Sequence, residues 1–166
     1  MNIKYLLGSI LLMLSPTTTT AQEPEANLCT PNEIMIASCR LDEKKQRTVS
    51  FCSSADQKRV TYRIGTVSTM EMDVTFPEDS RLYRWVDRAT YTVYFGFRVM
   101  KYAYIFGVPQ ETFGAKAFLD VTKQDKDLMS RTCTSNSFGE KMLDSAAIQE
   151  VSDDLVRGNG FLFPPR

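Results

Sequence analysis

Two pairs of closely spaced carboxylates are the residues of this 166-residue chain best placed to do acid–base chemistry. Glu71 and Asp73 lie two positions apart, and Asp153 and Asp154 are adjacent. Paired carboxyl groups can hydrolyse glycosides when one of them has a raised pKa and acts as the acid. Neither pair lies in a setting that would raise a pKa, because the first has cross-strand partners and the second lies on a solvated helix face. A carboxylate-dependent hydrolase is therefore the weakest of three functions considered.

The absence of histidine narrows the chemistry further. Ser-His-Asp and Cys-His nucleophiles, histidine zinc sites and the usual acid–base catalysis at neutral pH depend on an imidazole. The sequence also has no glycine-rich phosphate loop, calcium-binding loop or cluster of metal ligands. We therefore expect a protein without enzymatic activity, without catalytic residues, and without a metal or other cofactor.

Four cysteines are the remaining reactive residues: Cys29, Cys39, Cys52 and Cys133. An even number in an exported chain indicates two disulfides, because the compartment is oxidising. No two of them have the C-x-x-C spacing of redox or zinc sites. We expect structural bridges, which leave no thiolate nucleophile.

Export is indicated by residues 1–21. Lys4 precedes an apolar run from Tyr5 to Leu14, and Thr19-Thr20-Ala21 offers a small-residue cleavage site, as in a secretory signal peptide. The run has ten residues, whereas a membrane-spanning helix needs about 20. We expect cleavage near Gln22 and no transmembrane segment in the mature protein.

The charge of the mature chain is nearly balanced. Removal of residues 1–21 takes away one lysine and leaves 19 basic and 20 acidic side chains. Nucleic-acid binding needs a clustered basic surface, so we expect no nucleic-acid partner. The rest of the chain fits one domain, with an N-terminal arm at 22–32, a folded unit at 33–158 and a tail at 159–166.

The segments that must position these residues have the composition of β-strands. Each is rich in β-branched or aromatic residues, and Asp, Gly, Pro or Lys separate them. The recurrence of such segments at roughly 8–12 residues predicts an antiparallel sandwich or partly open barrel of eight or nine strands. The expected strands are Glu33–Leu41, Arg47–Ser54, Arg59–Gly65, Thr69–Phe76, Arg81–Val86, Thr90–Arg98, Tyr102–Val108, Gly114–Thr122 and Leu128–Thr132.

The register of the first hairpin bears on the disulfides. If Cys39 lay directly opposite Cys52, Phe51 would lie opposite Arg40. A one-residue shift gathers the apolar side chains on one face and buries more apolar surface. It also turns the two thiols to opposite sides of the sheet, where they cannot be bridged. Of the three connectivities, Cys29–Cys52 with Cys39–Cys133 then fits best.

The second hairpin has apolar alternation in both strands. A three-residue connection from Thr66 to Ser68 pairs Ile64 with Met70 on the apolar face. The same register sets Arg63 opposite Glu71 on the polar face. It therefore pairs apolar side chains on one face and opposite charges on the other.

The segment from Tyr91 to Pro109 is aromatic on both strand faces. One interpretation is a pair of central strands whose second face is covered by a helix or loop. The other is an exposed platform of Tyr94, Tyr102 and Tyr104 that binds a partner, since tyrosine is enriched at binding hot spots.

Arginines collect on outward strand positions, among them Arg59, Arg63 and Arg98. They form either an ordinary solvated face or a patch that receives an acidic partner. Together with the three tyrosines, they are the candidate partner-binding residues.

A C-terminal helix is predicted over about 138–157. Ser137 and Glu140 have the spacing of a capping box, and Gly158 supplies a stop. Leu143, Ala147, Val151 and Leu155 recur every four residues on one stripe. This helix is available to cover the second face of the aromatic strands.

A family resemblance rests on three short motifs. Ala37-Ser38-Cys39, Val49–Ser54 and Tyr62-Arg63-Ile64-Gly65 form an SC…VS-x-C-x-S…Y-R-x-G pattern. The pattern resembles the N-terminal part of a group of small exported bacterial proteins, most of them described only as hypothetical. The match covers residues 29–76 and, more faintly, the strand ending at Cys133. It implies a periplasmic protein and supplies no catalytic residues.

The favoured function is therefore a periplasmic protein-binding module. Such a module would neutralise another protein, as an immunity protein acts on an envelope-targeting toxin or an inhibitor acts on a wall-degrading enzyme. The alternative is a ligand carrier or envelope-assembly factor, which predicts a cavity lined by Met70, Met72, Tyr62 and Phe95.

Overall fold

The computed structural model describes residues 27–110 and 114–166, and only the backbone of 135–138. The predicted signal peptide at 1–21 and the first part of the predicted arm lie outside the described residues.

The described chain is mainly β, as predicted, with ten strands and one short helix. Nine strands match the expected segments to within a few residues at most ends. The strands are β1 (Glu33–Leu41), β2 (Thr48–Ser54), β3 (Arg59–Thr66), β4 (Thr69–Pro77), β5 (Leu82–Asp87), β6 (Thr92–Val99), β7 (Tyr102–Val108), β8 (Phe118–Lys123), β9 (Lys126–Phe138) and β10 (Ile148–Val151), and the helix is α1 (Asp153–Gly158).

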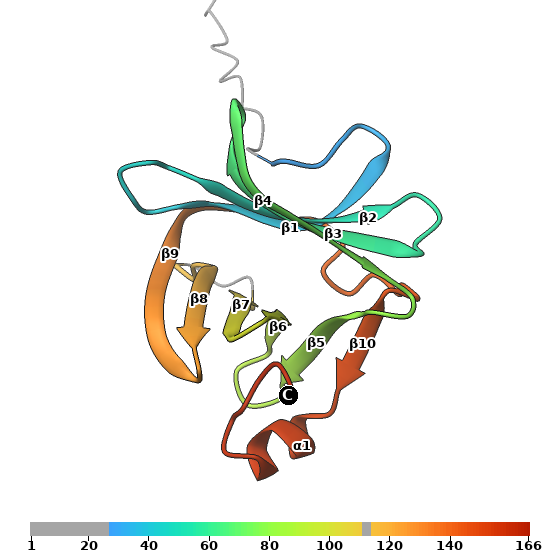
Figure 1. The fold of residues 1–166 in the computed structure, drawn as a ribbon, viewed down its shortest axis with the longest axis vertical. Coiled ribbons are helices and arrows are strands. Elements are labelled where there is room, and N and C mark those ends of the chain that lie inside the picture. The colour runs from blue at the N-terminus through green and yellow to red at the C-terminus, as the bar shows by residue number, and fades with distance from the viewer. Residues whose placement is uncertain (1–26, 111–113) are drawn as a thin grey trace, which may run out of the picture.

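All ten strands belong to one sheet that does not close into a barrel. Its order is β10-β5-β6-β7-β8-β9-β1-β2-β3-β4, and every pairing is antiparallel except that of β10 with β5. The long strand β9 pairs with β8 along its first half and with β1 along its second half. It therefore carries the sheet from one half to the other, as Figure 1 shows on its left side.

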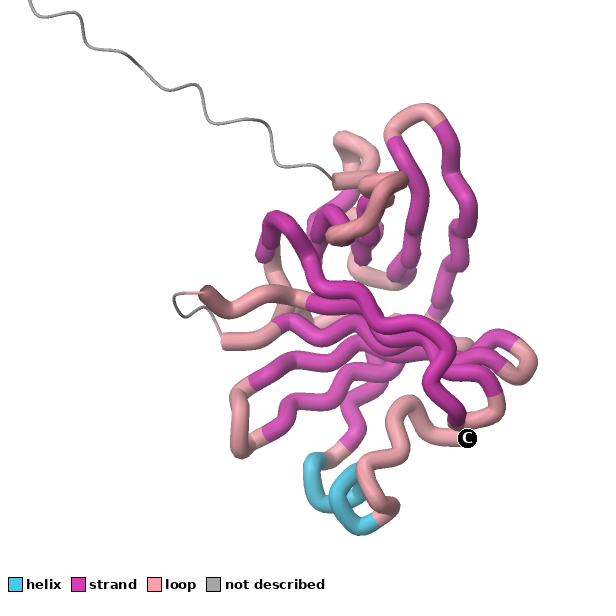
Figure 2. Tube along the Cα trace, turned by 90° about the vertical axis from the view of Figure 1, so that its left-hand side faces the viewer, coloured by secondary structure: helices cyan, strands magenta, loops and turns pink. Residues whose placement is uncertain are grey.

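The core lies between the two halves of this sheet. Alternate residues of each strand face inward, which follows from the period-2 geometry of strands. Phe51 of β2 reaches across to Phe95 of β6 and Phe106 of β7, with ring centroids 5.3 and 5.5 Å apart. All three side chains are almost completely buried. In Figure 2, α1 and the C-terminal segment lie at one end of the strand-built body.

The first hairpin adopts the register that separates the thiols. Cys39 lies opposite Val49, and Ala37 lies opposite Phe51. Cys39 is bonded to Cys133 and Cys52 to Cys29, the pairing that the register argument favours. Cys52 faces away from the core but is fully buried, because the segment around Cys29 covers it.

The predicted register of the second hairpin is wrong in detail. The connection between β3 and β4 has two residues, not three, and a bulge at Glu71 follows it. Ile64 consequently lies opposite Met72, and Arg63 opposite Asp73. An extra residue in one strand reverses the facing of the residues beyond it, which leaves Met70 on the exposed side.

The predicted helix over 138–157 is also wrong for most of its length. Strand β9 continues through Phe138, and Ile148–Val151 forms the edge strand β10 beside β5. Only Asp153–Gly158 is helical, capped by the hydroxyl of Ser152. Tertiary contacts override the helical pattern, because Arg84 donates to the Lys141 and Leu143 carbonyls that a helix would use internally.

The C-terminal tail docks on the outer face of the β5–β6 pair. Phe163 is 4% exposed and lies directly on Gly96, where a β-carbon would come within 2.6 Å of its ring. Its ring centroid lies 5.7 Å from that of Trp85. The tail, together with α1, therefore covers the second face of the aromatic strands. Within the described ranges, no helix has the length and apolar composition needed to cross a bilayer.

Candidate functional site

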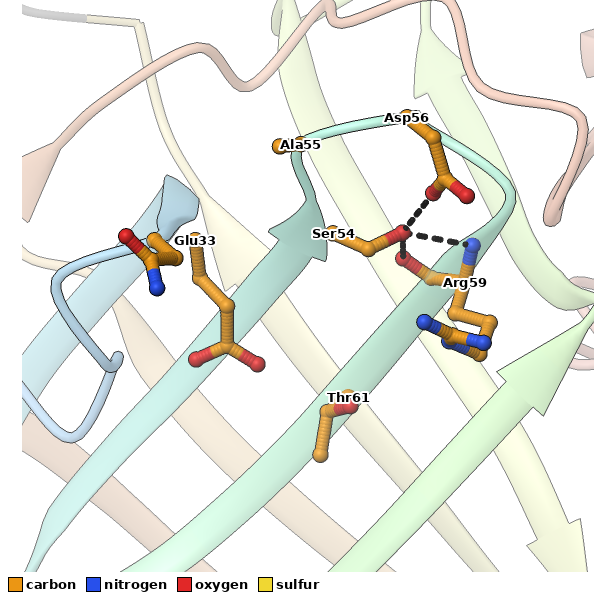
Figure 3. A pocket seen from close by; sticks show the side chains of 7 residues that line it. Glu33, Ser54, Ala55, Asp56, Arg59 and Thr61 are labelled. Carbon is orange, nitrogen blue, oxygen red and sulfur yellow. Dashed lines mark hydrogen bonds between the residues drawn. The ribbon is translucent and has the colours of Figure 1, made fainter.

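A polar hollow of about 430 Å³ lies at the end of the β2–β3 hairpin, beside the start of β1 (Figure 3). We call it the hairpin hollow. Its lining residues are Asn32, Glu33, Ser54, Ala55, Asp56, Arg59 and Thr61. The group mixes both charges with hydroxyl and amide groups, so it can bind polar atoms but contains no nucleophile with a base beside it.

The turn that shapes the hollow is fixed by one serine. The hydroxyl of Ser54 donates to Asp56 and accepts from the backbone N–H of Arg59 at 3.1 Å (Figure 3). That hydroxyl, followed by the backbone N–H of Lys58, lowers the pKa of the Asp56 carboxyl below its ordinary value. Asp56 is therefore an anion at neutral pH, held in place by the turn.

The opposite wall of the hollow is tied to the sheet by Arg63. Its guanidinium donates to both carboxylate oxygens of Glu33, at 2.7 and 3.0 Å, and to Asp73 at 3.0 Å. Burial is the largest single influence on the pKa of Glu33 and raises it, but the hydrogen bonds from Arg63 and Thr30 and the charge of Arg63 together outweigh it, so the net pKa lies below the ordinary value. The Cys29–Cys52 bridge anchors the same segment four residues before Glu33.

Arg59 differs from Arg63 in having an exposed side chain. Its guanidinium has no hydrogen bond or ion pair among the described residues, although its charge contributes to the lowered pKa of Asp56. Arg59 is thus a cation in the hairpin hollow that forms no ion pair with the described part of the fold.

The six candidate partner-binding residues do not form one surface. Arg59 and Arg63 lie on the outer face of β3, whereas Tyr94 and Arg98 lie on the outer face of β6 under the C-terminal tail. Tyr102 and Tyr104 are half-buried and pack against the core from β7.

Two of these residues are engaged by the tail and its neighbours. Tyr94 stacks on Trp85 with a centroid distance of 4.5 Å. Arg98 donates to the carbonyls of Pro164 and Pro165 and pairs with Asp125 at 3.1 Å. The expected tyrosine platform is therefore divided between two faces of the sheet, and its Tyr94 end is covered.

Three of the four carboxylates in the two pairs, Glu71, Asp73 and Asp153, serve as ion-pair partners. The hydrogen bond from Arg47 holds the pKa of Glu71 below its ordinary value, the opposite of what a general acid needs. Asp73 pairs with Arg63, and Asp153 accepts from Trp85 at 2.9 Å and from Arg157 at 2.9 Å. In the part of the chain that the structure describes, no three metal-ligating side chains come together.

A second cavity, of about 380 Å³, opens between the two halves of the sheet. We call it the inter-sheet cavity. Of the four residues expected to line a ligand cavity, only Met72 lies in its wall. Tyr62 and Phe95 are buried in the core, and the bulge turns Met70 outward. Its other apolar walls are Ile64, Tyr104, Leu119, Val121, Leu128 and Met129, with Arg47 and Glu71 at the polar side.

Sequence reasoning missed most of this wall. Leu119 and Met129 belong to β8 and β9, which the strand order brings opposite β3 and β4. Alternation marks such residues as inward-facing, but it does not say which distant strand lies across from them.

Comparison with protein families, with characterised proteins and with solved structures finds no match for this chain. The function must therefore be argued from the site itself.

Proposed function

We propose that this protein is an exported, non-catalytic binding protein that neutralises another protein, as an immunity protein or an enzyme inhibitor does. The partner docks on the hairpin hollow. The observation that carries the proposal is Arg59, an exposed guanidinium without an ion pair among the described residues, set in a hollow whose other charged groups are fixed.

Rigidity of the hollow supports this role. The Cys29–Cys52 bridge and the bidentate Glu33–Arg63 pair hold one wall, and the Ser54 hydrogen bonds hold the other. A surface already fixed in its bound shape loses little conformational entropy on association. Two disulfides also fit the oxidising compartment in which a periplasmic or secreted partner would be met.

The chemistry of Arg59 indicates an acidic group on the partner. A guanidinium offers parallel N–H donors that match a carboxylate, and arginine is enriched among the residues that dominate binding energy. Because Asp56 lies beside Arg59, a partner with a basic residue next to its carboxylate would fit both charges.

The test is an affinity measurement with the charge-reversed variant. The protein without residues 1–21 is immobilised, its stoichiometric partner from envelope extract is identified, and the dissociation constant is measured. Arg59→Glu should weaken binding by about 30-fold or more. Arg88→Ala, which removes an exposed arginine outside the hollow, is the matched control. Retention of full affinity by Arg59→Glu, or recovery of no stoichiometric partner, would contradict the proposal.

A further inference from the structure

The C-terminal tail is held on the outer face of the β5–β6 pair by side-chain contacts. Residues 162–166 belong to no strand or helix, and no backbone–backbone hydrogen bond joins them to the described part of the fold. A strand of the sheet, in contrast, is fixed by a ladder of such bonds. The tail therefore lies on this face in the way that a short peptide lies on the surface of a protein that binds it.

Phe163 is the anchor of the tail and fills a slot in the surface of the sheet. Gly96 forms the floor of the slot, and the atoms nearest to a β-carbon built there all belong to the Phe163 ring. The rings of Trp85 and Tyr94 lie beside it, with centroids 5.7 and 6.4 Å from that of Phe163. The slot thus fits a large aromatic side chain, which is 4% exposed when bound.

Two polar side chains bind the residues after the anchor. Arg98 donates from Nε to the carbonyl oxygens of Pro164 and Pro165, at 3.0 and 3.2 Å. Proline has no backbone N–H, so its carbonyl is the only backbone hydrogen-bonding group that it offers. Asp125 accepts from both Arg98 and Arg166. The face therefore binds an aromatic ring, two proline carbonyls and a cation, in that order along the segment.

The tail does not fill the space around its last two residues. A hollow of about 410 Å³ lies between Pro165, Arg166 and α1, and another of about 610 Å³ lies between the same two residues and the β4–β5 connection. The first hollow has apolar walls from α1, and the second combines aromatic rings with carboxylates and an arginine. A segment with larger side chains at these two positions would gain contacts that the tail lacks.

These hollows distinguish between two occupants that could replace the tail. The tail of a second copy would make the same contacts and leave the same hollows unfilled. It would also compete with a tail that is tethered beside the groove at an effective concentration on the order of millimolar. A segment of a different protein can fill the hollows as well, so it can displace the tail.

We propose that the outer face of the β5–β6 pair is a peptide-binding groove for an extended segment of another protein, in which an aromatic residue precedes proline and a basic residue. The chain's own tail occupies the groove until such a segment displaces it. Proline-containing segments commonly bind to aromatic-lined grooves. This groove is separate from the hairpin hollow and does not depend on the partner proposed for Arg59.

The test uses the protein without residues 1–21 and the synthetic peptide GNGFLFPPR, which has the sequence of residues 158–166. Phe163→Ala removes the anchor from the protein's own tail and leaves the groove open. Calorimetry should show saturable one-site binding of the peptide to this variant, and the emission of Trp85 should shift to shorter wavelength on binding. Wild type should bind the peptide at least tenfold more weakly, because its own tail competes.

Peptide variants test which contacts matter. The peptide with Phe163→Ala should bind at least tenfold more weakly than GNGFLFPPR, whereas the matched control with Phe161→Ala should bind equally well, since Phe161 is 59% exposed in the tail. The peptide with Pro165→Trp places a large side chain beside the two hollows and should bind at least threefold more tightly.

A second protein variant tests the slot itself. Gly96→Leu in the Phe163→Ala background places a side chain where only the Phe163 ring would clash, so the fold should survive while peptide binding is lost. Phe163→Leu takes the place of Phe163→Ala if the alanine variant does not fold.

Four results would overturn the proposal. They are no saturable binding of GNGFLFPPR to the open variant, equal affinities of wild type and the open variant, weaker binding of the Pro165→Trp peptide, and a wild-type dimer that excess peptide dissociates. The last result would identify a second copy as the occupant. Unchanged peptide binding by Arg59→Glu would show that the groove and the hairpin hollow are independent sites.

Discussion

Arg47 is the residue on which the polar side of the inter-sheet cavity depends. Its guanidinium donates to both carboxylate oxygens of Glu43 and to Glu71 in the bulge of β4. The side chain is only 18% exposed, so these pairs are less screened than ordinary surface pairs. Arg47 therefore holds the β1–β2 connection against β4.

The Glu43–Arg47 pair predicts a pH dependence of stability. The hydrogen bonds from Arg47 lower the pKa of Glu43 in the folded protein. A lowered pKa means that the pair stabilises the fold fully above the unfolded value, near 4.5, and that this stability is lost as pH falls through the folded value. Glu43→Gln should therefore lower Tm at pH 7 and have a much smaller effect at pH 3.

Thermal unfolding followed by circular dichroism at pH 7, 5 and 3 measures this difference. Asp42→Asn changes a neighbouring exposed carboxylate and serves as the control. Equal losses of Tm at pH 7 and pH 3 for Glu43→Gln would show that the charge of Glu43 is unimportant for stability.

Single arginines show how far sequence reasoning reaches at a site. Alternation places both Arg59 and Arg63 on the outer face of β3, and the structure agrees. Which of the two stays available depends on Glu33, thirty positions away from Arg63 and brought to it by the pairing of β1 with β2 and β2 with β3. Strand periodicity contains no information about that contact. The sequence could therefore predict that arginines lie on this face, but not which of them is left without an ion pair.

Among the elements, local patterns predicted strands well and the C-terminal region poorly. The nine expected strands form because each combines β-branched and aromatic residues with a single inward face. Leu143, Ala147 and Val151 are buried, as the helical stripe predicts, but Leu155 is 50% exposed. A four-residue spacing of apolar residues fits the period of a helix and also the two-residue period of a strand. The segment Ile148–Val151 forms a strand because it pairs with the edge of β5.

The tail is the element whose contribution to stability can be measured most directly. Phe163 is buried against Gly96 and Trp85, whereas Phe161, two residues earlier, is 59% exposed. Phe163→Ala should lower the free energy of unfolding by roughly 3 kcal/mol, as for other buried phenylalanines. Phe161→Ala is the matched control and should change it by less than about 0.5 kcal/mol.

Fluorescence provides a second measurement for the same variants, because Trp85 is the only tryptophan. Trp85 is 5% exposed and lies under the tail. Phe163→Ala should shift its emission to longer wavelength, and Phe161→Ala should not. An unshifted spectrum with unchanged stability for Phe163→Ala would mean that the tail does not cover this face in solution.

For the molecule as a whole, the two disulfides constrain the chain over very different lengths. Cys29–Cys52 spans 23 positions within one half of the sheet, whereas Cys39–Cys133 spans 94 and joins β1 to β9. Because β9 carries the sheet from one half to the other, the second bridge fixes the strand at which the two halves meet.

This difference predicts unequal losses of stability. Loop-closure entropy in the unfolded chain gives about 4–5 kcal/mol for the longer bridge and about 3–4 kcal/mol for the shorter one. The double variant Cys39→Ala/Cys133→Ala should therefore unfold at a lower denaturant concentration than Cys29→Ala/Cys52→Ala. The first variant should lose stability throughout the sheet. The second should chiefly release the segment before β1, so only the second is expected to weaken partner binding at the hairpin hollow in protein that is still folded. Urea unfolding of both variants, with binding measured on the folded protein, tests the argument, and equal midpoints would contradict it.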